Sequence, residues 1–461
     1  MKKYIYGIGY LADLTHSYLE KSKIEIEGFV SNNLMVYTKE QIFSTIIYPS
    51  NILLTQVKSK ETKVVIASIP INEAVKKLKE NGFSEEEFEI SPILKDFKSE
   101  SYSNRYGAIY CQGFFENYRG VNIGNEIQVI AAKQLLPQSP AIINYNEIAI
   151  SPQISQPPIN VIMNGYFSCL DEKIFPPSEN IHPLYLSFHL NKTAAKFMLD
   201  EAGIKHLKKY SPIGCRDINT LNTLREKNIP CYYSSCLTLT LGETMGICKG
   251  IRQGIYFVDV HRPKFDKIKI KPFMLFKIPT YLKLYKNMAK QNYFYSKSFA
   301  KQMIHCIKFY TYYSNNFSDE ILFKIEFVKH SRDFIDFKNQ QERFVFAKSL
   351  LRKYKEAALV VTSRIHCALP CLSFETPVLF VTDKTSSFHD NRFEGIQNLF
   401  RTFVIGDTKM TATDEDTPVK ISLTHLFKNK TDYMPLKDNL LKKVKYFISN
   451  LNHDVKSSVE K

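Results

Sequence analysis

The sequence lacks the features that mark membrane-spanning, zinc-ribbon and disulfide-rich proteins. No stretch of it approaches the roughly 18–20 uninterrupted apolar residues that a membrane-spanning helix needs. None of its nine cysteines are spaced as C-x-x-C, and their odd number argues against a secreted disulfide scaffold. Nothing in the sequence demands a metal or a resident cofactor, so we expect neither. These absences favour a reducing compartment, and we expect a cytoplasmic protein.

Acidic residues are too few to balance the basic ones. The chain has 461 residues, with 62 Lys and Arg against 46 Asp and Glu, and its formal net charge is +16. Apolar residues make up 44%, which excludes wholesale disorder. The length predicts about two to four domains.

Residues 1–100 predict a small Rossmann-like α/β domain. A strand at 4–8 runs into the sequence G-x-G-x-x-A at 7–12, a helix follows to about residue 21, and a second strand covers 24–31. Such glycines let the backbone approach a phosphate, but they also let a helix pack closely on a strand. A dinucleotide site needs an acidic residue where this chain has Ser31 and Asn32, so close packing is favoured. The glycines and Asp13 also interrupt the apolar run that a signal peptide would need.

Two longer blocks alternate strands with helices, which predicts parallel sheets covered by helices. We expect residues 101–260 to form one Rossmann-like half, and residues 341–461 to form a second half with C-terminal helices and a tail. Predicted strands cover 141–144, 160–164, 184–188, 255–260, 358–362 and 378–381; predicted helices cover 125–136, 193–201, 220–227 and 341–354. Residues 408–419 predict a loop.

Residues 261–340, between these blocks, predict a basic, aromatic helical connector. The segment 261–312 contains twelve Lys or Arg and a single acid, Asp266, with aromatic and aliphatic residues interleaved. This composition fits an ordinary solvated insert, an anionic membrane surface or a nucleic acid. No nucleic-acid-binding module can be read in the sequence, and the accompanying apolar residues favour a membrane over a nucleic acid. The solvated insert and the peripheral membrane contact both stay open.

One segment places an arginine and an acid at the start of a helix. Residues 211–217 predict a turn that ends in Gly214-Cys215-Arg216-Asp217, before a helix over 218–227. Unpaired amides at a helix start attract anions, and Arg216 adds a bidentate donor. Asp217 is either the helix cap or a catalytic acid.

A second segment places an arginine and a histidine beyond a buried strand. The apolar strand that ends near Thr362 is followed by Ser363-Arg364-Ile365-His366 and then by a helix. Ligands of open α/β sheets bind beyond the carboxyl ends of the strands. Because each αβ block contributes an arginine at such a junction, the two together predict a cleft for a multiply charged anion.

These segments, with several others in the same order, resemble the polysaccharide pyruvyl transferases. The resemblance covers about 106–256 and 355–400. It rests on Asn122-Ile123-Gly124-Asn125-Glu126-Ile127-Gln128, Asn164-Gly165-Tyr166-Phe167, Ser187-Phe188-His189, Gly214-Cys215-Arg216-Asp217, the run Ser235-Cys236-Leu237-Thr238-Leu239-Thr240-Leu241, Ser363-Arg364-Ile365-His366 and Arg392-Phe393-x-Gly395. Asn125 departs from the family, which usually has Asp there; if that acid matters for catalysis, its role must pass elsewhere.

The resemblance implies two Rossmann-like halves arranged like those of GT-B glycosyltransferases, with the active site between them. It also implies transfer of a pyruvyl group from phosphoenolpyruvate to a sugar as a ketal. Arg216, Arg364 and His366 would contact phosphoenolpyruvate, and histidine suits general acid or base work near neutral pH. Further substrate contacts are expected from Asn122, Gly124, Asn125, His189, Asp217, Ser235, Ser363 and Arg392, although His189 also fits a satisfied buried histidine.

The expected acceptor is a sugar of a surface polysaccharide precursor, which could be polyprenyl-linked at the inner face of the cytoplasmic membrane. A GT-B glycosyltransferase with a nucleotide-sugar donor is the alternative enzyme, because a fold does not fix a function. A non-catalytic basic protein that binds anionic polymers is a hypothesis from another class. It predicts that replacing Arg364 or His366 by Ala changes no activity.

Overall fold

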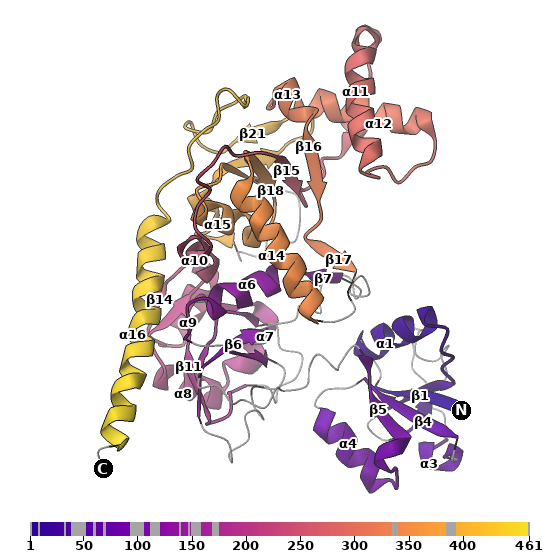
Figure 1. Ribbon diagram of the computed structural model, residues 1–461, viewed down its shortest axis with the longest axis vertical. Coiled ribbons are helices and arrows are strands. Elements are labelled where there is room, and N and C mark those ends of the chain that lie inside the picture. Colours follow the sequence, from indigo (N-terminus) through magenta and orange to yellow (C-terminus); the bar gives the residue numbers. More distant parts are fainter. Residues whose placement is uncertain are drawn as a thin grey trace.

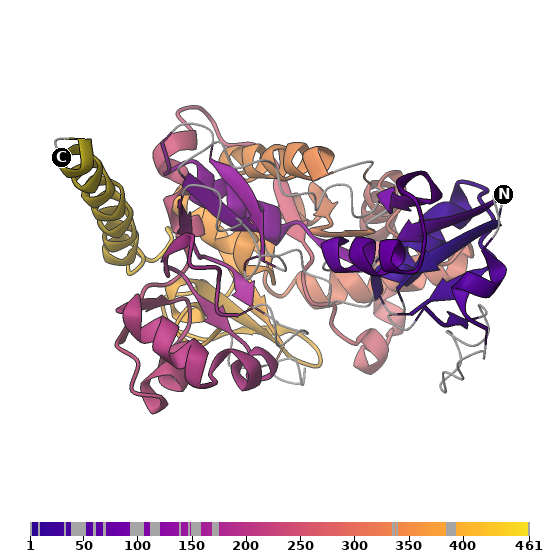
Figure 2. The ribbon, with the colours of Figure 1, turned by 90° about the horizontal axis from the view of Figure 1, so that it is seen from below.

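The chain folds as several α/β units, seen in a computed structural model (Figure 1). The structure describes residues 2–7, 10–31, 34–37, 52–58, 61–67, 71–92, 106–110, 120–137, 140–145, 148, 158–167, 175–333, 337, 340–383 and 393–459. The N-terminal unit and the C-terminal helix lie at opposite ends of the molecule (Figure 2). Among the described helices, none combines the length and the apolar composition that crossing a bilayer requires.

The N-terminal unit is a five-stranded sheet in the order β3-β2-β1-β4-β5, parallel except for β3. Its elements are β1 (Lys2–Tyr6), α1 (Tyr10–Lys21), β2 (Gly28–Val30), β3 (Val36–Tyr37), α3 (Leu54–Val57), β4 (Thr62–Ile66), α4 (Ile71–Glu80) and β5 (Phe88–Ile90). This confirms the predicted Rossmann-like order of strand and helix. The chain leaves α4 at Gly82, whose φ of +82° explains the glycine there. Two residues of the G-x-G-x-x-A sequence, 8 and 9, lie outside the described residues.

The first half contains a parallel four-stranded sheet in the order β11-β9-β6-β8. The sheet strands are β6 (Tyr106–Tyr110), β8 (Ala141–Asn144), β9 (Ile159–Ile162) and β11 (Ile181–Leu184), and two parallel pairs lie beside them, β10 (Tyr166–Phe167) with β12 (His189–Leu190) and β13 (Ile213–Cys215) with β14 (Cys231–Tyr233). Its helices include α6 (Gly124–Lys133), α7 (Lys192–Met198), α8 (Glu201–Lys209) and α9 (Ile218–Glu226). The strand predicted over 184–188 instead ends at Leu184, and the chain turns through Ser187, which has φ +59°.

The second half contains a six-stranded sheet in the order β16-β15-β18-β19-β20-β21, parallel except for β21. Its elements include β15 (Ile255–Val258), β16 (Ile325–Val328), α14 (Gln340–Glu356), β18 (Leu359–Thr362), α15 (Ile365–Ser373), β19 (Val378–Thr382), β20 (Arg401–Ile405) and β21 (Met410–Ala412). The predicted boundaries place β15 in the first half and β16 in the connector, but both strands pair within this sheet. Their apolar side chains fit either sheet, so the hydrophobic pattern could not assign them. The segment 408–419, predicted as a loop, contains β21.

The two halves share one hydrophobic core. Side chains of α6, of the 3₁₀ turn η4 (Leu237–Thr240), of α14 and of α15 are buried together in it. The C-terminal helix α16 (Met434–Val459) runs back from the second half along the first (Figure 1), and its Leu440 and Val444 enter the same core. The strand β7 (Gly120–Asn122) also pairs antiparallel with β17 (Ser331–Asp333), which joins the halves a second time.

A buried ion pair ties α6 to α14. Glu126 and Arg343 have fully buried side chains, and Arg343 Nε lies 3.3 Å from Glu126 Oε1. The Tyr110 hydroxyl donates to the same oxygen at 2.5 Å. Burial raises the pKa of the Glu126 carboxyl, and the Arg343 cation and the Tyr110 hydroxyl offset part of that rise. The pair therefore couples the start of α6 to the helix that precedes β18 in the second half.

Replacing Arg343 by Met should destabilise the protein by about 3 kcal/mol, because it leaves the Glu126 carboxylate buried without its cation. The free energy of unfolding can be measured by urea denaturation. Lys353→Met is the matched control, since it breaks an exposed pair with Glu326, which should contribute less than about 1 kcal/mol. Adding Glu126→Gln to Arg343→Met should restore part of the loss, and a further loss would contradict this account.

Candidate active site

The halves make a close contact where His366 packs on Gly124. A Cβ at Gly124 would lie 2.6 Å from His366 Nδ1 and 3.0 Å from its Cβ, distances too short for any side chain. Gly124 is the first residue of α6, and its amide donates to Asn122 Oδ1 at 3.1 Å. His366 lies in the first turn of α15 and is 7% exposed. This contact brings the Asn122-Ile123-Gly124-Asn125 segment of one half against the Ser363-Arg364-Ile365-His366 segment of the other.

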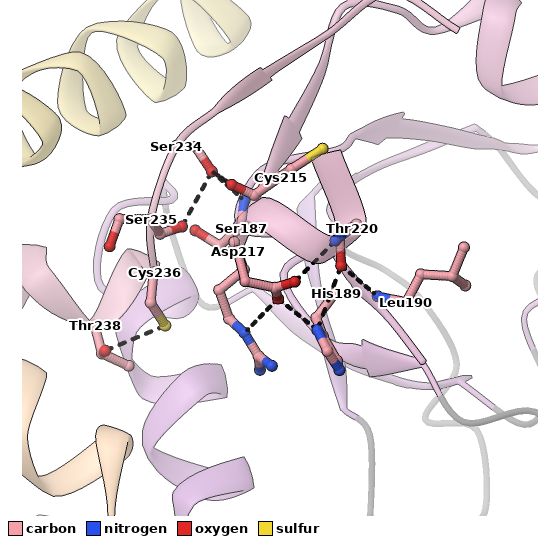
Figure 3. A network of polar contacts seen from close by, with 11 residues as sticks. Ser187, His189, Leu190, Cys215, Asp217, Thr220, Ser234, Ser235, Cys236 and Thr238 are labelled. Carbon is pink, nitrogen blue, oxygen red and sulfur yellow. Dashed lines mark hydrogen bonds and ion pairs between the residues drawn. The ribbon is translucent and has the colours of Figure 1, made fainter. Parts of the chain in front are cut away.

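A buried carboxylate organises the start of α9 (Figure 3). Asp217 is the N-cap of this helix, and its Oδ1 accepts from the Thr220 amide at 2.9 Å. Its Oδ2 lies 2.5 Å from His189 Nδ1 and 3.5 Å from Arg216 Nε. The side chains of Asp217, His189 and Arg216 are all at most 2% exposed. Asp217 therefore caps the helix and at the same time orients an imidazole and a guanidinium.

The charges around Asp217 keep it ionised. Burial alone would raise the pKa of its carboxyl, but the charge and hydrogen bond of His189, the Arg216 cation and the Thr220 amide outweigh burial and lower it. The Arg216 side chain forms an ion pair with Asp217 through Nε. Within the described part of the chain, neither terminal nitrogen of this buried guanidinium has a protein acceptor, which makes them suited to an anionic ligand.

Two serines beside this cluster hold unusual backbone conformations. Ser187 and Ser235 are fully buried and have φ values of +59°, a region that residues other than glycine rarely adopt. Ser234 ties the loops together, since its hydroxyl accepts from the Ser187 amide and donates to the carbonyl of Cys215 (Figure 3). Strained backbone of this kind gathers at functional sites, where the surrounding structure holds it in place.

Arg364 is also held by a carboxylate. It is the N-cap residue of α15, and its Nε lies 3.3 Å from Asp259 Oδ2. Asp259 directly follows β15, has φ +40°, and also accepts from the amide of His330 at 3.1 Å. His330 is fully buried, and burial together with the Arg364 cation lowers its pKa to about 3, so it is neutral. The guanidinium of Arg364 is thereby fixed at the carboxyl end of the sheet.

The start of α9 touches the second half as well. The Ile218 amide donates to the Glu394 carbonyl at 3.1 Å, and a Cβ at Gly395 would lie 2.8 Å from Ile218 Cγ1. The turn η4, which follows Cys236, packs on α15. Burial raises the pKa of the Cys236 thiol, and the Arg216 cation offsets part of that rise. The Arg216 segment and the His366 helix therefore border the same interface between the halves.

The other predicted site residues fall into three groups. Asn125 lies on α6 with its amide oxygen 3.4 Å from Gln128 Nε2, and Asn122 caps Gly124 as described. Ser363 donates to the Val381 carbonyl and accepts from the His261 amide, so its hydroxyl joins backbone segments of the second half. Arg392 lies outside the described residues.

Sequence reasoning missed Asp259, His330 and the Glu126–Arg343 pair. Asp259 could have been predicted as a site residue, because it directly follows an apolar strand, and ligand-facing residues of α/β sheets occur at such positions. His330 and Arg343 could not, since their partners are distant in the sequence. No group of three or more potential metal ligands occurs among the described residues.

The comparison with protein families bears on the segment that carries both arginines. Residues 199–385 match the model of the polysaccharide pyruvyl transferase family. The match spans less than half of the chain and includes Arg216, Asp217, Ser235, Ser363, Arg364 and His366. It confirms the resemblance to the pyruvyl transferases over these residues. No curated protein matches the chain in sequence.

Several solved structures resemble the chain in a structural search, at low similarity. A UDP-N-acetylglucosamine 2-epimerase is 8% identical over 84% of this chain and 80% of its own, with a TM-score of 0.25. The UDP-GlcNAc 2-epimerase of Methanocaldococcus jannaschii, in complex with UDP-GlcNAc and UDP, is 11% identical over 88% and 90%, with a TM-score of 0.23. The wall teichoic acid polymerase TagF is 10% identical over 80% and 94%, with a TM-score of 0.27. TM-scores this low carry no weight for function, and the α/β fold class rests on the parallel sheets themselves.

Asp217→Asn should lower stability in a pH-dependent way. A carboxyl whose pKa is lowered in the folded state stabilises the protein above its unfolded pKa of about 4, and this contribution is lost as the pH falls through the folded value. The difference in free energy of unfolding between the wild type and the variant should therefore be large near neutral pH and shrink below about pH 4. Urea denaturation across this range measures it.

Asp200→Asn is the matched control for this prediction. Asp200 caps α8 through the Gly203 amide at 2.7 Å, as Asp217 caps α9, and it forms no ion pair with any described residue. Because Asn caps helices about as well as Asp, Asp200→Asn should change stability little at any pH. A pH-independent difference for Asp217→Asn would contradict the assigned charge network.

Proposed function

We propose that this chain transfers a pyruvyl group from phosphoenolpyruvate to two hydroxyl groups of a sugar, forming a pyruvate ketal on a surface polysaccharide precursor. The observation that carries the proposal is the contact of His366 with Gly124. This contact brings the start of α15, which carries Arg364 and His366, against residues 122–125 of the other half. The match of residues 199–385 to the polysaccharide pyruvyl transferases supports it.

The two arginines suit the two anionic groups of phosphoenolpyruvate. The donor carries a carboxylate and a phosphate, and a guanidinium binds either group through paired hydrogen bonds. Each arginine has an aspartate beside its Nε: Arg364 Nε donates to Asp259 Oδ2 at 3.3 Å, and Arg216 Nε forms an ion pair with Asp217 Oδ2 at 3.5 Å. Both head groups are therefore oriented before a ligand arrives, which reduces the entropy lost on binding.

The reaction requires proton transfers and stabilisation of the leaving phosphate. A proton adds to the methylene carbon of phosphoenolpyruvate and makes it a methyl group, one sugar hydroxyl bonds to C2, and the C2–O bond to phosphate breaks. A second hydroxyl then bonds to C2 and closes the ketal ring. Two hydroxyl protons are released, one replacing that given to the methylene carbon and one leaving with phosphate or solvent. We assign His366 to proton transfer near the phosphate, and Arg216 and Arg364 to the charge that develops there.

His189 is the candidate for contact with the acceptor sugar. Asp217 holds its Nδ1, which is how a carboxylate fixes the orientation of a catalytic imidazole in other enzymes. This ion pair supplies a buried acid in the same half as Asn125, where the family usually has Asp. We propose that the Asp217–His189 pair takes over the role of that missing acid.

The acceptor is proposed to be a sugar of a polysaccharide precursor, free or linked to a polyprenyl lipid. Incubating the protein with phosphoenolpyruvate and a panel of galactose, mannose and N-acetylated sugars tests this through phosphate release. A parallel reaction with UDP-sugars tests the glycosyltransferase alternative. Phosphate release that depends on a sugar supports the proposal, whereas UDP release without phosphate release would replace it with the alternative.

Replacing His366 or Arg364 by Ala should lower kcat/KM for phosphoenolpyruvate by roughly 30- to 1000-fold, which corresponds to about 2–4 kcal/mol of lost transition-state stabilisation. Steady-state phosphate release at saturating acceptor gives the value. Unchanged activity in both variants would refute the enzymatic role and favour a non-catalytic anion-binding protein.

Gly124→Ala should impair the same activity although it removes no titratable group. The new methyl group would push His366 away from its position on α6, and small displacements of catalytic groups are costly. We expect a loss of about tenfold or more in kcat. Gly250→Ala is the control, because a Cβ there meets no atom within 4 Å. Full activity in Gly124→Ala would show that the contact with His366 does not matter for catalysis.

A further inference from the structure

The helices α11 (Ile278–Lys290) and α12 (Phe299–Tyr313) project from the second half, away from the candidate active site (Figure 1). They lie within the predicted connector, and they contain none of the residues assigned to pyruvyl transfer. The inner face of α11 is well packed. Its Tyr281, Leu284 and Met288 are buried with aromatic residues of α12 in the core of the second half. The projection is therefore a folded unit with a defined outer face.

The outer face begins with exposed apolar side chains. The turn η6 (Pro272–Lys277) directly precedes α11 and carries Phe273 and Phe276, which are 60% and 89% exposed. The helix continues with Ile278 and Leu282, also exposed. Leaving two phenylalanines and two aliphatic residues in water along one short stretch is unfavourable unless another surface covers them.

Exposed lysines follow the apolar residues along α11. Residues 278, 282, 286 and 290 follow one another at intervals of four, so they form one row along α11. Ile278 and Leu282 occupy the N-terminal part of this row, and Lys286 and Lys290 occupy the rest, all exposed. Lys271 is exposed too, and it precedes the two phenylalanines in the sequence. Of the ion pairs formed by the described residues, none involves Lys271, Lys286 or Lys290, so no described carboxylate pairs with these lysines. We call these seven residues the α11 surface: Lys271, Phe273, Phe276, Ile278, Leu282, Lys286 and Lys290.

We propose that the α11 surface binds an anionic lipid membrane. Aromatic and aliphatic side chains flanked by lysines suit the boundary between headgroups and acyl chains, where apolar groups enter and ammonium groups contact lipid phosphates. The positive charge of the lysines favours an anionic membrane as the partner of this surface. A second copy of the chain would present the same positive charge. A nucleic acid would satisfy the lysines but would leave Ile278 and Leu282 exposed to polar backbone.

Vesicle flotation tests the proposal with the full chain. The vesicles contain phosphatidylcholine alone or phosphatidylcholine with about 30% phosphatidylglycerol, at low salt, where charge contributes most. We expect binding to the anionic vesicles only, weakened by raised salt. Phe273→Ser with Phe276→Ser, and Lys271→Gln with Lys286→Gln and Lys290→Gln, should each weaken vesicle binding by about tenfold or more.

The matched control replaces Lys192, Lys205 and Lys208 by Gln. These lysines are exposed on α7 and α8 of the first half, so their loss changes the net charge by the same amount. The control should bind vesicles as the wild type does, and thermal denaturation should show that all variants fold. Equal loss of binding in control and α11 variants would reduce the effect to net charge and overturn the proposal.

Single-stranded DNA of about twenty nucleotides provides the remaining arm of the test. Vesicle binding that persists in the presence of this DNA supports the membrane. DNA binding through the same lysines, with no binding to anionic vesicles, would overturn the membrane proposal and assign the surface to nucleic acids. This outcome is independent of the phosphate-release assay, so the two proposals can fail separately.

Discussion

The contact between His366 and Gly124 is the constraint on which the rest of the site depends. Any side chain at residue 124 would overlap the imidazole, so the first turn of α6 and the first turn of α15 can approach only because this position is a glycine. The approach lets α6, η4, α14, α15 and α16 share one core, and the buried Glu126–Arg343 pair holds α6 against α14 at the same interface. Residues 122–125 and residues 363–366, which are far apart in the sequence, thereby become neighbours.

The electrostatics of the site follow from where the arginines lie. Both occupy helix starts, where backbone amides and the helix dipole already favour an anion. Each arginine lies beside an aspartate. Burial keeps the neighbouring His330 neutral, so this histidine adds no further positive charge. Positive charge is therefore concentrated on two guanidinium groups, which suits the proposed donor with its carboxylate and its phosphate.

The sequence predicted local structure well and long-range pairing poorly. Strand β18 and the residues after it were predictable because an apolar run ends in polar residues before a helix, and the cap at Asp217 followed from the same kind of pattern. The sheet to which Ile255–Val258 belongs was not predictable, because an apolar strand fits the sheet of either half. The aspartate that holds Arg364 and the partner of Glu126 lie about 100 and 200 residues away in the sequence, beyond the reach of any periodicity. The sheets confirmed the α/β class, while the roles of the site residues stay predictions.

The most direct test of the central claim is a crystal structure of the chain with phosphoenolpyruvate bound. The account predicts one ligand molecule in contact with Arg216 from the first half and with Arg364 or His366 from the second. A ligand bound by residues of one half alone, or Arg216 facing a separate solvent region from His366, would contradict it.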